Sequence, residues 1–110
     1  MLVSGVVVTS VPHADAYLAL LRELAANSRN VLWTATALEQ MGTTGIAARM
    51  AMNVLKLGMV EGEIVAGRSA GEWQAKIRLA ARGRPAIRVQ VTIIGDSRVA
   101  VNLVEWVDRN

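Results

Sequence analysis

The sequence contains no cysteine, no phenylalanine and only one histidine, His13, among its 110 residues. Without cysteine the chain can form neither a disulfide nor a thiolate metal site, and this composition suits a cytoplasmic protein. A single histidine excludes a His-rich metal site within one chain, and a histidine-activated nucleophile could use only His13. Because His13 lies beside Pro12 in a predicted loop, we interpret it as a surface residue. We predict no metal and no cofactor.

Long apolar runs are also missing, although 53% of the residues are hydrophobic. No stretch reaches the roughly 20 residues that a membrane-spanning helix requires, so we predict no membrane association. The apolar start, MLVSGVVVTSV, lacks the basic region and the apolar length of a signal peptide. We expect residues 1–11 to form an arm or strand that packs on a sheet edge or a neighbouring chain, which would support a homo-oligomer.

Residues 12–58 follow a helical pattern. Tyr17, Leu20, Leu21 and Leu24 recur at helical spacing after Pro12 and Asp15, which favour a helix start. The stretch Val31–Thr34 reads either as a brief strand or as the lead into a helix. That helix, capped by Thr34 or Thr36, should end at Met41, with Gly42 and Gly45 flanking a turn. A third helix is predicted over Ile46–Leu57.

Residues 60–108 follow the alternation of a β-sheet instead. Apolar and polar residues alternate in EWQAKIRLA, AIRVQVTII and RVAVNLVEW, where Leu103 continues the apolar series, and VEGEIVAG is a weaker fourth strand. Helices followed by an antiparallel meander predict one α+β domain. We expect two to three N-terminal helices on one face of a three- to four-stranded antiparallel sheet.

The alternation also predicts the register of the strands. If apolar residues share one face, Ile77 pairs with Val89, and Arg78 then lies opposite Arg88. In the next hairpin Val91 pairs with Val101. The same register places Lys76 opposite Gln90, and Gln90 opposite Asn102.

The outer face of the sheet therefore gathers polar and basic side chains: Lys76, Arg78, Arg88, Gln90 and Asn102, with Arg84 nearby. Two interpretations remain open. The face is either an ordinary solvated surface or a site where phosphate lies between two opposed guanidinium groups. The net charge of +3 is compatible with an anionic partner such as RNA but does not identify one.

The order of short motifs resembles a family of small bacterial proteins of unknown function related to BrnT-like and RelE-like toxins. Members carry (S/T)-x-H-A-x-x-R-M-x-x-R-G-I, then a helix, a G-x-(V/I) strand, a W-x-(Y/C/A)-K strand, a GR turn and a V-V-T-(I/V) strand. The matching residues lie within Val31–Asp108 and are Thr34, Ala37, Met41, Gly45, Ile46, Val54, Leu55, Gly58, Trp73, Lys76, Gly83, Arg84, Val91, Thr92 and Ile93.

The resemblance implies a RelE-like or barnase-like ribonuclease fold and an antitoxin protein as partner. It also implies an active-site element in which this chain differs. Thr36 stands where the family has histidine, and Gln40 and Thr44 stand where it has arginines. Threonine is no general base near neutral pH, and neither Gln nor Thr neutralises a phosphorane. We therefore predict a ribonuclease-like RNA-binding domain with weak or lost catalysis.

The alternative is a protein-interaction or oligomerisation module without enzymatic activity. In that interpretation the apolar arm and the methionine-rich segment Met50–Met59 bind a partner chain.

Overall fold

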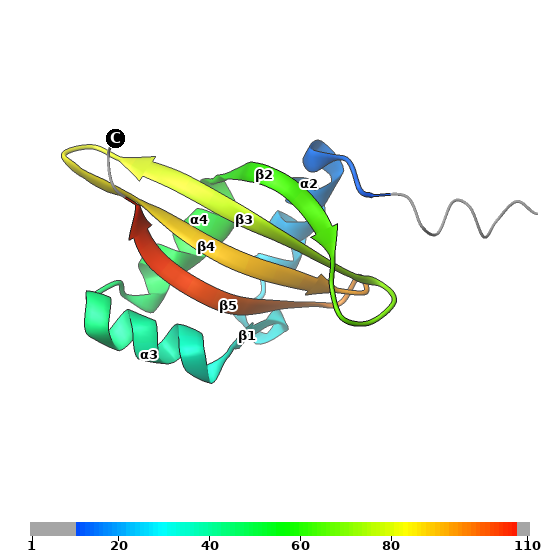
Figure 1. Cartoon of the computed structure of the whole chain (residues 1–110), viewed down its shortest axis with the longest axis horizontal. Helices are drawn as coiled ribbons and strands as arrows, with labels where there is room; N and C mark the ends of the chain where they lie inside the picture. The colour runs from blue at the N-terminus through cyan, green and yellow to red at the C-terminus, as the bar shows by residue number, and fades with distance from the viewer. Residues whose placement is uncertain (1–10, 108–110) are drawn as a thin grey trace, which may run out of the picture.

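A computed structural model describes residues 11–107, which form three α-helices, one short 3-10 helix and five β-strands (Figure 1). In chain order these are α2 (Ala14–Ala25), η1 (Ser28–Asn30), β1 (Val31–Trp33), α3 (Ala35–Thr44), α4 (Ala48–Leu57), β2 (Met59–Ala66), β3 (Glu72–Ala81), β4 (Arg84–Ile94) and β5 (Arg98–Val107). The predicted arm, apart from Val11, lies outside the described residues.

The five strands form one sheet in the order β1-β5-β4-β3-β2. Helices α2 and α4 pack on one face of the sheet, and α3 packs along β5. In Figure 1 the sheet lies in front of α2 and α4, and no other described element covers its near face. The α+β class is therefore confirmed.

The prediction of a three- to four-stranded antiparallel sheet is wrong, because β1 adds a fifth strand parallel to β5. Val31 pairs with Val99 and Trp33 with Val101. Three residues are too few to show a strand period, and their partner lies 68 positions further along the chain. The sequence left a brief strand at Val31–Thr34 open, but only the folded chain shows that it joins the sheet beside β5.

The predicted register between β3 and β4 is confirmed. Ile77 pairs with Val89, and Arg78 lies opposite Arg88. Lys76 also lies opposite Gln90, as the alternation predicted. The apolar side chains of both strands therefore face the helices, and the basic ones point to the uncovered face.

The predicted register between β4 and β5 is wrong beyond one pair. Val91 pairs with Val101 as expected, but Gln90 lies opposite Leu103 instead of Asn102. Asn102 is thus one extra residue in β5, a β-bulge, and Leu103 follows it on the uncovered face instead of in the core. Val104 takes the core position and is fully buried.

Helix α3 is longer than predicted. It runs through Gly42 to Thr44 and ends at Gly45, which has the left-handed conformation that favours glycine at a helix end. The N-cap is Thr34, whose hydroxyl accepts a hydrogen bond from the Ala37 N–H. The third helix starts at Ala48, two residues later than expected.

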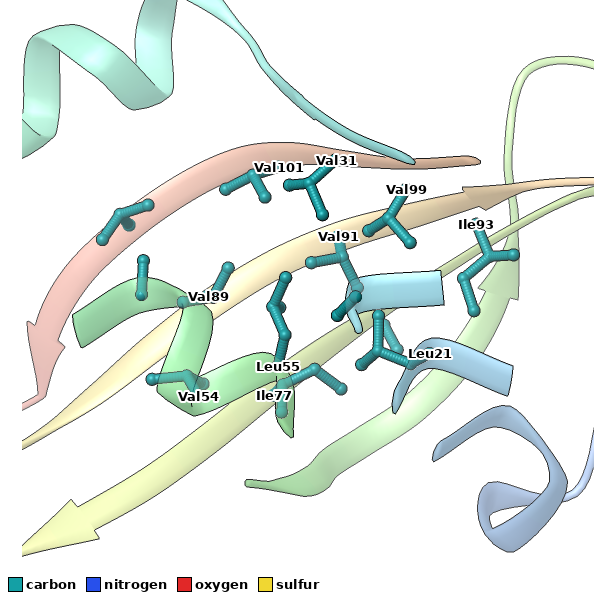
Figure 2. Close-up of a cluster of buried hydrophobic side chains, with 14 of the residues drawn as sticks. Leu21, Val31, Val54, Leu55, Ile77, Val89, Val91, Ile93, Val99 and Val101 are labelled. Carbon is teal, nitrogen blue, oxygen red and sulfur yellow. The ribbon is translucent and has the colours of Figure 1, made fainter. Parts of the chain in front are cut away.

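The core lies between the sheet and the helices (Figure 2). Leu21 of α2 and Leu55 of α4 point toward Ile77 and Val91 of the sheet, and all four are fully buried. The predicted apolar face of α2 and the buried residues Val54 and Leu55 of α4 therefore form the core, whereas Leu57 at the end of α4 is exposed. Met50 and Met52 also pack against this core.

Gly58 connects α4 to β2 where three backbone segments meet. A Cβ at this position would lie 2.7 Å from the Val54 carbonyl oxygen and 2.8 Å from that of Arg78. The Arg22 guanidinium also donates to the Gly58 oxygen at 2.6 Å. Glycine is required here because of this close approach, since its φ of −77° suits any residue.

We expect Gly58→Ala to lower the free energy of unfolding by about 1–3 kcal/mol, because the added methyl group meets rigid backbone. The matched control is Gly42→Ala. A Cβ at Gly42 meets nothing within 4 Å, so this change should stabilise helix α3 by up to about 1 kcal/mol. Urea unfolding measures both. Equal effects of the two substitutions would contradict the packing at Gly58.

Candidate functional site

A hollow lies on the uncovered face of the sheet, beside the start of α3. Its volume is about 560 Å³. Strands β3, β4 and β5 form its floor, and Thr34 and Thr36 flank it from the α3 side. The lining residues are Thr34, Thr36, Arg68, Glu72, Gln74, Gln90, Thr92, Ile94, Ala100, Asn102 and Leu103.

The bulge in β5 places two neighbouring side chains, those of Asn102 and Leu103, in this hollow. The Asn102 amide nitrogen donates to the Thr92 hydroxyl at 2.8 Å. The Thr34 hydroxyl donates to the Asn102 carbonyl oxygen at 3.3 Å. The bulge is therefore held from both sides, by β4 and by the cap of α3.

The three positions that the family resemblance singles out lie on α3, but they do not form one site. Thr36 is exposed and lines the hollow. Gln40 turns toward β5, where its side-chain oxygen accepts from the Val104 N–H at 2.9 Å. The Thr44 hydroxyl donates to the Gln40 carbonyl oxygen at 2.7 Å, within the helix.

Gln40 and Thr44 therefore have structural roles. The Thr44 carbonyl oxygen also accepts from the Trp106 indole N–H at 3.0 Å. The pairing of β1 with β5 ends at Val101. Beyond that residue, α3 takes the place of a neighbouring strand, because Gln40 accepts the hydrogen bond of the Val104 N–H. Of the three positions, Thr36 alone faces the hollow.

Arg78 and Arg88 lie opposite each other on the uncovered face, as predicted, but a carboxylate lies between them. Glu61 of β2 accepts from Arg88 at 2.5 Å and lies 4.0 Å from Arg78. Glu105 of β5 accepts from Arg88 at 2.9 Å. Arg88 is thus bound by two carboxylates, and a phosphate between the arginines would have to displace Glu61.

Pairing within this cluster shifts the pKa of Glu61 and of Arg88 in the direction that favours their charged forms. The hydrogen bond from Arg88 lowers the pKa of Glu61 below its usual 4.5, and the positive charges of Arg88, Arg78 and Lys76 lower it further against the opposing effect of desolvation. Hydrogen bonds to Glu61 and Glu105 raise the pKa of Arg88. Both groups are therefore charged at neutral pH.

The sequence interpretation missed these two carboxylates for different reasons. Glu61 lies on the weakest predicted strand, whose register the alternation did not define. Glu105 comes opposite Arg88 only because of the bulge; without the extra residue Val104 would be there. The remaining predicted cations, Lys76 and Arg84, are exposed.

The sequence also did not predict that the residues lining the hollow come together. Gln90 and Asn102 were expected on this face and do line it, together with Thr36. Lys76, Arg78, Arg84 and Arg88 lie outside it. The other lining residues come from α3, from the loop after β2 and from three strands, so no local motif connects them.

Within residues 11–107 no three histidine or carboxylate side chains gather as metal ligands. No helix in this range is both long and apolar enough to cross a membrane. Our comparisons of the chain with family models, curated proteins and solved structures found no match. The toxin resemblance thus rests on the motifs quoted above and stays a prediction.

We expect Gln40→Ala to lower the free energy of unfolding by about 1–3 kcal/mol, because it leaves the N–H of the buried Val104 without an acceptor. Its neighbour Glu39 is exposed, so Glu39→Ala should change stability by no more than about 0.5 kcal/mol. Chemical denaturation of both variants tests this. A Gln40 variant as stable as the control would show that the contact contributes little.

The ion pair of Glu61 with Arg88 should make stability depend on pH. Because the pKa of Glu61 is lowered in the folded state, its contribution is complete above the ordinary carboxylate pKa and is lost as pH falls through the lowered value. A double-mutant cycle with Glu61→Gln and Arg88→Gln should give a coupling of about 0.5–1 kcal/mol at neutral pH. The coupling should vanish in acid. A coupling that persists unchanged at low pH would contradict this assignment.

Proposed function

We propose that this chain binds single-stranded RNA on the uncovered face of its sheet, as a ribonuclease-like domain with weak or lost catalysis. The observation that carries the proposal is one continuous face on which a polar hollow adjoins exposed cations. Lys76 and Arg78 are exposed on this face, and Arg82 and Arg84 are exposed at the β3–β4 hairpin. The hairpin projects from one end of the sheet (Figure 1).

The composition of the hollow supports binding over cleavage. RNA cleavage by attack of the 2′-hydroxyl requires a general base, a general acid and cations for the phosphorane. The titratable groups that line the hollow are one carboxylate, Glu72, and one guanidinium, Arg68. A guanidinium does not release its proton in proteins, so this pair lacks a general acid. His13, the only histidine of the chain, lies at the start of α2 and does not line the hollow.

The carboxylates on the face limit its affinity for phosphate. Glu61 and Glu105 neutralise Arg88, the most central of the cations, and Glu61 also lies near Arg78. A bound strand would contact Lys76 and the hairpin arginines directly, and would gain Arg88 only by displacing Glu61. We therefore infer moderate affinity with a pronounced dependence on salt.

Glu61→Gln should strengthen RNA binding about three- to tenfold, because it frees Arg88 and Arg78 for phosphate. Glu63→Gln is the matched control. It removes the same charge from the same strand, and among the described residues Glu63 forms no ion pair with an arginine. The measurement is fluorescence anisotropy with a labelled single-stranded RNA at about 50–200 mM salt, the range in which phosphate contacts lose affinity.

In the same titrations, Arg78→Gln with Arg88→Gln should flatten the slope of log affinity against log salt by about 0.7 for each lost phosphate contact. Equal gains for the two glutamate variants would show that only net charge matters. If no RNA binds at about 50 mM salt, the proposal fails.

The second candidate is a protein-interaction module, and exposed apolar side chains favour it. Leu57 and Met59, at the corner between α4 and β2, are 63% and 62% exposed. They adjoin the outer edge of β2, which no other strand of the described residues pairs with and where another chain can add a strand. Absence of RNA binding in the titration above would make this candidate the leading one.

A further inference from the structure

The hollow beside α3 has the size and the chemistry of a ligand site. Its volume of about 560 Å³ falls within the roughly 300–1,000 Å³ of small-molecule sites. Its two charged lining residues, Arg68 and Glu72, have opposite signs. The hollow therefore has no net charge and favours a neutral group, whereas phosphate is attracted to the exposed cations outside it.

Some hydrogen-bonding side chains in the hollow have donors or acceptors that no other described residue uses. The Gln74 and Gln90 amides form no hydrogen bond with other described residues, although both line the hollow. The Asn102 amide nitrogen is used by Thr92, which leaves the Asn102 oxygen as an acceptor directed by the bulge. Each free amide offers one donor side and one acceptor side.

Apolar atoms complete the site. Ile94 and Ala100 lie on neighbouring strands of the floor, and Leu103 follows Asn102 in the bulge. A ligand that fits must therefore present an apolar surface and, along an edge, alternating donors and acceptors. An unpaired nucleobase has this form, and side-chain amides pair with its edge in two hydrogen bonds.

We infer that the hollow holds one unpaired base of the bound RNA, with the amides of Gln74, Gln90 and Asn102 contacting the edge of the base. This inference rests on the proposed RNA binding and adds the group that is recognised. The backbone phosphates on either side of that base lie toward the cations of the same face. Lys76 is suited to such a contact, because it neighbours Gln74 on β3 and lies outside the hollow.

The test uses labelled single-stranded oligonucleotides of equal length: homopolymers of A, C, G and U, and an abasic ribose-phosphate oligomer. The native chain should bind at least one homopolymer about 5- to 150-fold more tightly than the abasic oligomer, the range expected for one paired base edge. Gln90→Ala and, separately, Gln74→Ala should reduce that preference and leave binding of the abasic oligomer unchanged. Neither side chain forms a hydrogen bond with another residue of the 11–107 range, and melting temperatures verify that both variants are folded.

Lys76→Ala is the control outside the hollow. It should weaken binding of every oligomer by a similar factor, the abasic one included, and reduce the salt slope by about one phosphate contact. If the abasic oligomer binds as tightly as all four homopolymers, or if both glutamine variants keep the full preference, the base site is wrong while RNA binding stands. If no oligomer binds, the proposed function fails and this inference fails with it.

Discussion

The extra residue in β5 is the constraint on which the uncovered face depends. A β-bulge at Asn102 shifts the pairing with β4 by one position, and everything beyond it in β5 changes sides. Val104 enters the core, Leu103 lines the hollow, and Glu105 comes opposite Arg88. The bulge thus supplies one residue each to the core, the hollow and the charge cluster.

The bulge persists because α3 satisfies the backbone that it disrupts. Three residues of β5 pair with β1. Beyond them, the outer edge of β5 forms hydrogen bonds with α3 and its N-cap residue. Thr34 binds the carbonyl oxygen of Asn102, and Gln40 accepts from the Val104 N–H. Buried backbone groups without partners are costly, so a helix that supplies them allows a bulged strand at this position. This accounts for the glutamine at position 40, whose side-chain oxygen serves the backbone of β5.

The charges of the face are balanced more closely than composition suggests. The net charge of the chain is +3, yet the half-buried guanidinium of Arg88 is bound by two carboxylates. Opposed arginines that would repel each other in isolation are instead joined through Glu61. Among the described residues, Lys76 and the hairpin residues Arg82 and Arg84 are exposed cations that form no ion pair.

The sequence by itself determined the features that depend on local periodicity. Alternation of apolar residues predicted the pairing of Ile77 with Val89 and hence Arg78 opposite Arg88, because a one-residue slip would expose the core face. Helical spacing likewise predicted the buried face of α2 around Leu21.

Only the tertiary structure decided what depends on contacts between distant segments. The short strand β1 exists through its pairing with β5, and a bulge leaves no periodic signal because apolar residues lie on both sides of Asn102. Glu61 contacts Arg88 from β2, and the pairing of β2 with β3 shifts in register between Glu61 and Val65. The hollow follows from these long-range pairings, since its lining comes together only when α3, the loop after β2 and three strands meet at one end of the sheet.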